Sequence, residues 1–124
     1  MHMIKHSKIV KKKSPNKFVI LLKCTKLVRN WYVIPLTYYR LTKNKFVILK
    51  LKSGLKIKLR VNSTDLQAFL NVWIIQEYQD ERDFEINNDD VIIDVGGHIG
   101  LFALYCSQFC KNGKIFSFEP IKEN

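Results

Sequence analysis

The last third of the chain alternates short apolar segments with glycine-rich turns, and this order constrains the fold more than any other feature. Val91–Val95 is a near-continuous apolar run, and Gly96-Gly97-His98-Ile99-Gly100 follows it directly. A helical pattern then extends from Leu101 to Asn112-Gly113, before the second apolar run of Lys114–Pro120. A strand, a glycine turn, a helix and a second strand predict a βαβ unit whose parallel strands are buried.

A different pattern precedes this unit. Asn16 is placed to cap a basic amphipathic helix that extends to about Trp31. The runs Phe46–Leu51 and Leu55–Val61 flank Lys52-Ser53-Gly54 and predict a β-hairpin with one solvated face. Ser63-Thr64-Asp65 then begins a second amphipathic helix that reaches about Tyr78.

We therefore expect an α/β chain with three sections. Residues 1–15 form a basic flexible tail, residues 16–88 hold the helix, hairpin and helix, and residues 89–124 form the βαβ unit. The acidic segment Asp80–Asp90, with the turn Asn87-Asn88-Asp89-Asp90, separates the last two sections.

Charge is divided unevenly along the chain. The first 60 residues hold 17 Lys or Arg and no acid, whereas the remaining residues hold 4 basic residues and all 11 acids. Solvated lysine faces explain much of this, but the asymmetry also leaves open a peripheral contact with an anionic membrane. Nucleic acid is disfavoured as a partner because the sequence contains no known nucleic-acid-reading module.

Several protein classes are excluded by the same sequence. The apolar runs are far shorter than the roughly 20 residues of a membrane helix, and Lys23 and Lys26 interrupt the run that would resemble a signal peptide. We expect a cytoplasmic protein. Cys24, Cys106 and Cys110 are odd in number and lack the spacing of a zinc site, so neither a disulfide framework nor a metal site is expected.

The glycine turn carries the residues most suited to ligand binding. Gly96 and Gly97 allow a sharp turn and a close backbone approach to a ligand, and Gly100 allows the helix to start close to the strand. The helix N-terminus can receive an anionic group. Asp94 lies near the end of the first strand, and Glu119, 25 residues later, ends the second, where an acid can accept both ribose hydroxyls.

The spacing of the glycines distinguishes two cofactors. The dinucleotide fingerprint Gly-x-Gly-x-x-Gly would need glycine at position 95, which is Val95. Asp94 followed by Gly96 and Gly100 is instead the form expected for S-adenosylmethionine. A fragment of an NAD(P)-dependent oxidoreductase stays an alternative, as does a non-enzymatic basic module that contacts a membrane or nucleic acid.

The motifs resemble those of a known enzyme family. Val91–Gly100, Phe118-Glu119-Pro120 and Glu123-Asn124 are similar to the first two motifs of the FkbM-family S-adenosylmethionine-dependent methyltransferases. Asn62-Ser63-Thr64-Asp65 and Gln76-Glu77-Tyr78 resemble the segments that precede those motifs. His98 stands where the family loop often has asparagine.

The resemblance implies a fold and a function. It implies the start of a Rossmann-like class I methyltransferase domain, a doubly wound sheet, with a hydroxyl of a sugar or related metabolite as the methyl acceptor. Asp94, Gly96, Gly97, His98, Gly100 and Glu119 would bind S-adenosylmethionine. Because such a sheet has seven strands, the resemblance also implies that the sequence is a truncated, amino-terminal part that is inactive alone.

Overall fold

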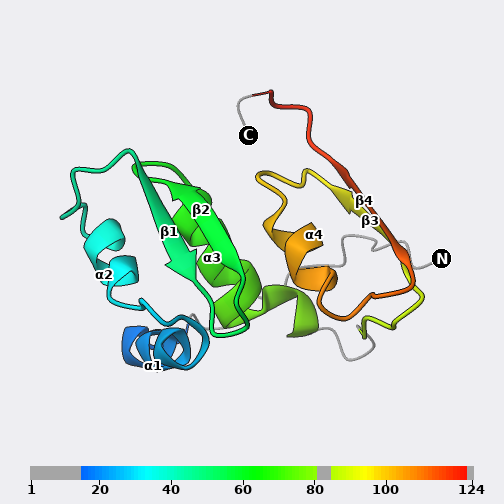
Figure 1. Cartoon of the computed structure of the whole chain (residues 1–124), viewed down its shortest axis with the longest axis horizontal. Helices are drawn as coiled ribbons and strands as arrows, with labels where there is room; N and C mark the ends of the chain where they lie inside the picture. Colours follow the sequence, from blue (N-terminus) through cyan, green and yellow to red (C-terminus); the bar gives the residue numbers. More distant parts are fainter. Residues whose placement is uncertain (1–14, 81–84, 123–124) are drawn as a thin grey trace. The chain divides into compact units, whose positions relative to one another are not determined.

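The structure is a computed structural model that describes residues 15–80 and 85–122 (Figure 1). The described chain is mixed α/β, as the sequence predicts, and divides into two compact units. We call residues 15–75 the basic unit, and residues 76–80 with 85–122 the glycine-loop unit. The predicted tail lies outside the described residues except for Pro15. The sequence places the division after residue 88, whereas the compact units separate after Ile75.

An antiparallel hairpin forms the centre of the basic unit. Strands β1 (Phe46–Lys50) and β2 (Lys56–Arg60) pair so that Ile48 lies opposite Lys58. Alternate side chains are buried, and they are Val47, Leu49, Ile57 and Leu59. The other face is exposed and carries most of the lysines of the two strands. This alternation confirms the predicted hairpin with one solvated face.

Two short helices precede the hairpin, α1 (Lys17–Leu27) and α2 (Val33–Tyr38). The predicted cap is confirmed, because Asn16 Oδ1 accepts a hydrogen bond of 3.1 Å from the Phe18 amide. The prediction that the helix continues to about Trp31 is wrong. Val28 takes an extended conformation and bridges Leu51 beside the hairpin, so strand pairing ends the helix at Leu27.

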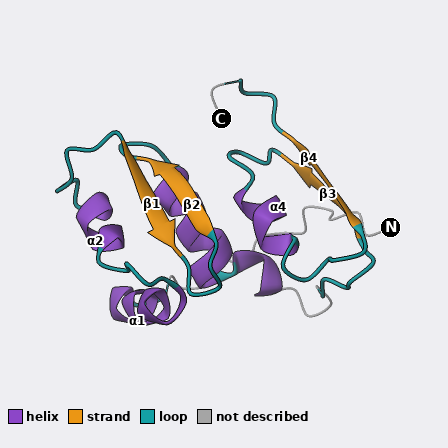
Figure 2. Ribbon diagram, viewed as in Figure 1, coloured by secondary structure: helices purple, strands orange, loops and turns teal. Residues whose placement is uncertain are grey.

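Helical turns follow the hairpin (Figure 2), and they are of two types. Helix α3 (Asp65–Phe69) packs against β2 and continues as the π-helical segment η1 (Leu70–Ile75), which contacts α1. Gln76 has a φ of 56°, which ends the segment before the 3₁₀ turn η2 (Glu77–Asp80). The single helix predicted to reach Tyr78 is therefore interrupted by one left-handed residue.

The glycine-loop unit contains the predicted βαβ order. Strands β3 (Val91–Val95) and β4 (Lys114–Phe118) are parallel, and helix α4 (Leu101–Cys106) connects them. The helix is shorter than its apolar pattern predicts, because the chain forms a turn from Ser107 to Phe109. Helix α4 lies against β4 and buries four side chains, those of Leu101, Phe102, Tyr105 and Cys106.

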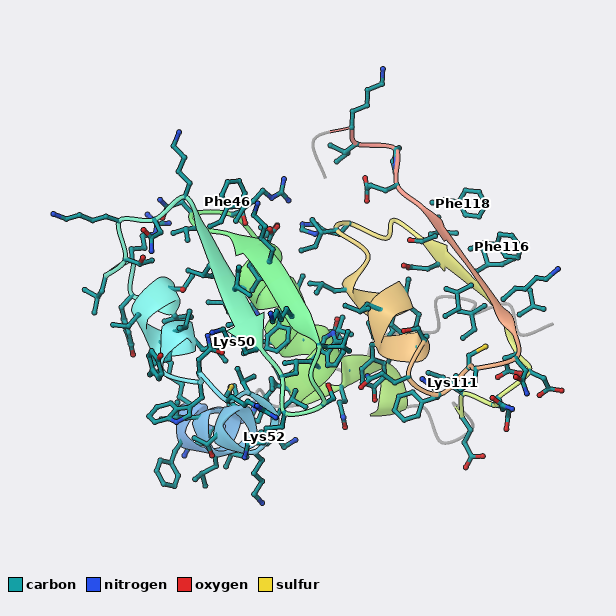
Figure 3. All side chains as sticks on the ribbon, viewed as in Figure 1. Phe46, Lys50, Lys52, Lys111, Phe116 and Phe118 are labelled. Carbon is teal, nitrogen blue, oxygen red and sulfur yellow. The ribbon has the colours of Figure 1, made fainter. Side chains whose placement is uncertain are left out.

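The prediction that both strands are buried is wrong for one face of this sheet. Five apolar side chains point away from α4 and are exposed, and we call them the outer sheet face: Val91, Ile93, Val95, Phe116 and Phe118. Figure 3 shows the last two projecting from β4 on the side away from the helix. Within the described residues the sheet has two strands and one covering helix, so no element packs on this face.

Candidate functional site

The loop from Gly96 to Gly100 joins β3 to α4 and is held mainly by its own backbone. The amides of Gly96 and Gly97 donate to the Phe118 carbonyl, at 2.8 and 3.1 Å, and the Gly100 amide donates to the Gly97 carbonyl at 2.7 Å. These bonds tie the loop to the end of β4. The amide of the N-cap residue Gly100 is therefore engaged within the loop, and α4 has only six residues.

The three glycines of the loop have different physical roles. Gly96 and Gly100 have φ values of 78° and 79°, with open space where a Cβ would be, so left-handed backbone is what requires glycine there. The expectation that Gly100 serves close packing of helix and strand is wrong. Gly97 is the packed position, because a Cβ there would collide with Ser117 Oγ and lie 2.9 Å from Asp94 Oδ2.

Glu119 fastens the loop from the other strand. Its Oε2 accepts a hydrogen bond of 2.7 Å from the His98 amide, and its Oε1 accepts one of 2.8 Å from the Ile121 amide. The sequence brings Glu119 to the expected place beside the glycine loop, but it does not reveal these two backbone partners.

Asp94 lies next to this carboxylate on the neighbouring strand. Burial raises the pKa of Asp94 above its ordinary value, the Ser117 hydrogen bond lowers it, and the negative charge of Glu119 raises it again. Ser117 Oγ donates that hydrogen bond to Asp94 Oδ2 over 3.0 Å. Two carboxylates that disfavour each other's ionised form make this edge of the sheet suited to a positively charged group.

His98 is half-buried and has a φ of 51°, in the left-handed region that asparagine and histidine enter more readily than most residues. Its backbone amide makes the contact with Glu119. Residue 98 therefore contributes to the site through its left-handed backbone and its amide. The hydrogen bond from this amide to Glu119 cannot be predicted from the side chain of His98.

Two residues outside the predicted set lie beside the site. Ser117 bonds to Asp94, and a polar residue between Phe116 and Phe118 is the sequence signal that could have identified it. Tyr78 packs on Phe102 with ring centroids 4.5 Å apart. Burial raises the pKa of Tyr78, and the charges of Glu77 and Asp94 raise it further.

The described residues contain no cluster of three or more His, Cys, Asp or Glu side chains that could hold a metal ion. No helix in the described ranges is long and apolar enough to cross a bilayer. Comparison of the chain with models of protein families, with curated proteins and with solved structures finds no match.

Proposed function

We propose that the glycine-loop unit binds S-adenosylmethionine as part of a Rossmann-like methyltransferase. The observation that carries this proposal is the pair of carboxylates, Asp94 and Glu119, at the ends of adjacent parallel strands beside a left-handed glycine loop. S-adenosylmethionine offers a sulfonium, an ammonium group and two ribose hydroxyls, which suit these two acids. The acceptor class, a hydroxyl of a sugar or related metabolite, rests on the family resemblance alone.

The same geometry disfavours a dinucleotide. A pyrophosphate binds to unengaged backbone amides of the glycine loop and the helix start. Here the amides of Gly96, Gly97 and Gly100 are bonded within the loop and to Phe118, and the His98 amide is bonded to a carboxylate. Val95 occupies the position where the dinucleotide fingerprint has its first glycine. It is β-branched and lies in strand β3.

The residues have distinct roles in the proposed complex. Glu119 would accept the ribose hydroxyls while its backbone partners hold it in place. Asp94 would face the ammonium group at the zwitterionic methionine end. Gly96 and Gly100 would set the course of the loop, and Gly97 would let it lie against Ser117. Positioning and desolvation of the two reactants would supply the catalysis.

The test is a titration of the ¹⁵N-labelled chain with S-adenosylmethionine, followed by amide chemical shifts. We expect saturable shifts at Gly96, Gly97, His98 and Gly100. Glu119→Ala should weaken binding at least about tenfold, because it removes two charge-assisted hydrogen bonds worth roughly 1.5 to 3 kcal/mol each. Glu85→Ala removes an exposed acid of the same unit and serves as the matched control.

Three outcomes would contradict the proposal. The first is a titration in which S-adenosylmethionine shifts none of the loop amides. The second is equal weakening by Glu119→Ala and Glu85→Ala, which would indicate a diffuse charge effect. The third is saturable binding of NADH, with no binding of S-adenosylmethionine, which would favour the oxidoreductase alternative.

A further inference from the structure

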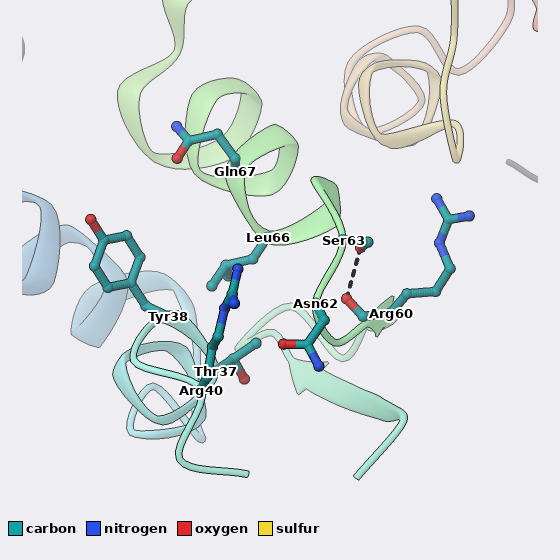
Figure 4. Close-up of a pocket in the computed structure, with 8 residues that line it drawn as sticks. All are labelled: Thr37, Tyr38, Arg40, Arg60, Asn62, Ser63, Leu66 and Gln67. Carbon is teal, nitrogen blue, oxygen red and sulfur yellow. Dashed lines mark hydrogen bonds between the residues drawn. The ribbon is translucent and has the colours of Figure 1, made fainter. Parts of the chain in front are cut away.

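A small polar pocket lies in the basic unit, where the end of α2 meets the turn between β2 and α3. Its volume is about 180 Å³, below the about 300 to 1,000 Å³ of pockets that enclose whole drug-sized ligands. Figure 4 shows Arg40 extending beside Thr37 toward Leu66, with Tyr38 and Asn62 on either side. A pocket of this size suits a single small group.

The charge of Arg40 has no counterion within its own unit. Asp65 is the one acid among residues 15–75, against 12 Lys or Arg. Its carboxylate is occupied by Arg60, whose Nη2 donates to Oδ1 at 2.7 Å and whose Nε donates to Oδ2 at 3.0 Å. The Arg60 amide also donates to Oδ2, at 2.8 Å. The pocket therefore presents the guanidinium of Arg40 with no acid of the basic unit left to balance it.

The other polar groups of the pocket favour a ligand that accepts hydrogen bonds. The hydroxyls of Thr37 and Ser63 donate to the backbone carbonyls of Val33 and Arg60. Gln67 Nε2 uses one hydrogen on Asn71 and has a second. Within the described residues no hydrogen bond engages the side chains of Arg40 and Asn62, so their N–H groups are available to a ligand in the pocket.

From this arrangement we infer that the pocket binds a phosphate group, with the guanidinium of Arg40 as its main partner. A guanidinium matches two phosphate oxygens at once, and the amides of Asn62 and Gln67 can donate to the others. The side chains of Tyr39 and Leu41, next to Arg40 in sequence, are 62% and 69% exposed. The phosphate can thus belong to a soluble compound or to a lipid headgroup with apolar chains beside these residues.

The backbone of Arg40 makes a sharp test possible. Arg40 ends α2 with a φ of 57°, in the left-handed region that favours glycine. Arg40→Gly therefore removes the guanidinium and relieves the backbone at the same time. We expect the melting temperature of this variant to stay the same or rise while phosphate binding is lost, which separates loss of the site from loss of the fold.

The experiment titrates the ¹⁵N-labelled full chain with inorganic phosphate, then with glycerol phosphate, at constant ionic strength. We expect saturable shifts at Arg40, Asn62 and Gln67, at least tenfold weaker binding for Arg40→Gly, and partial recovery for Arg40→Lys. Lys56→Gln removes one charge from the exposed hairpin face and is the matched control, with a change below twofold. Equal weakening by Arg40→Gly and Lys56→Gln, or shifts that do not saturate, would overturn the inference.

A second arm distinguishes the source of the phosphate. Vesicles of phosphatidylcholine with and without phosphatidic acid are sedimented with the wild-type chain and with Arg40→Gly. Phosphatidic-acid-dependent binding that Arg40→Gly abolishes supports a lipid headgroup, and soluble binding without vesicle binding supports a soluble phosphate. Vesicle or oligonucleotide binding that Lys56→Gln weakens as much as Arg40→Gly would overturn the pocket as the site.

Discussion

The carboxylate of Glu119 accepts a 2.7 Å hydrogen bond from the His98 amide, and this bond joins the end of β4 to the glycine loop after β3. The second oxygen holds the Ile121 amide at 2.8 Å. One acid at the end of a strand therefore shapes the chain on both sides of the proposed cofactor site.

Removal of this acid should loosen the loop in the absence of any ligand. We expect Glu119→Ala to increase amide hydrogen exchange at His98 and Ile121, because both amides lose their acceptor. Glu119→Gln keeps one carbonyl oxygen and should retain part of the protection. Unchanged exchange at both positions in Glu119→Ala would show that Glu119 does not hold the loop.

Asp65 should control the stability of the basic unit and its response to acid. Its side chain is 1% exposed. Burial raises the pKa of Asp65, but the hydrogen bonds from Arg60 and Ser63 outweigh it and hold the pKa below the ordinary value. Because the folded pKa is depressed, this stabilisation is complete above the ordinary value near 3.8 and is lost as pH falls through the folded pKa.

Asp65→Ala should lower the free energy of unfolding of the basic unit by roughly 1.5 to 3 kcal/mol at neutral pH, since the Arg60 amide loses its charged acceptor. Urea unfolding of wild type and variant at neutral pH and below pH 4 measures the effect. The difference in free energy of unfolding between wild type and Asp65→Ala should be smaller below pH 4 than at neutral pH. A difference that stays constant across that range would show that the ionised carboxylate is not the stabilising group.

The sequence predicts the local features of the fold but not those that depend on contacts between distant residues. It predicts the hairpin, the Asn16 cap and the βαβ order, because local periodicity and turn chemistry determine them. It does not predict that α1 ends at Leu27, because that depends on pairing between Val28 and the distant Leu51. It places Glu119 near the loop but does not reveal that Gly97 packs against Ser117, and it gives Gly100 a packing role where left-handed backbone is what requires glycine, because packing depends on tertiary contacts.

Alanine substitutions at Gly113 and Gly97 should show how easily the atoms around each glycine can move to accommodate a Cβ. A Cβ at Gly113 would collide with the Asp90 carbonyl and with Cys110 Sγ, and a backbone carbonyl beside β3 cannot move cheaply. Gly113→Ala should therefore destabilise the glycine-loop unit by more than about 2 kcal/mol. At Gly97 the collision is with the Ser117 hydroxyl, which can rotate away.

We expect Gly97→Ala to cost less than Gly113→Ala, because the ends of the Ser117 and Asp94 side chains can shift, at the cost of the hydrogen bond between them, whereas a backbone carbonyl cannot. Ser117→Ala removes the colliding oxygen and should recover part of that loss in the double variant. Thermal unfolding of the single and double variants measures both effects. Purely additive effects in the double variant would contradict the contact between positions 97 and 117.

The cysteines should behave as buried packing residues. Burial raises the pKa of Cys24 to about 11 and that of Cys106 to about 12, and Cys110 Sγ donates to the Asp90 carbonyl at 3.1 Å. The raised pKa keeps Cys24 as the thiol at pH 8, whereas the thiolate is the form that reacts. We expect a disulfide reagent to modify the native chain far more slowly than the urea-unfolded chain, and equal rates would contradict this burial.

The outer sheet face should make the chain self-associate. Val95 is 82% exposed and lies opposite Phe118 in the parallel register, with Ile93 and Phe116 as the next exposed pair. Contiguous apolar side chains on a two-stranded sheet favour association through that face. We expect light scattering to give a mass that rises with concentration, and Phe118→Lys to shift the equilibrium toward the monomer.

The matched control is Phe18→Lys, which places the same charge on an exposed phenylalanine of α1 in the basic unit. Association that Phe118→Lys weakens and Phe18→Lys does not would assign the contact to the sheet, because only the first change puts an unpaired charge into the apolar interface. A monomeric mass at every concentration would contradict association through the outer sheet face.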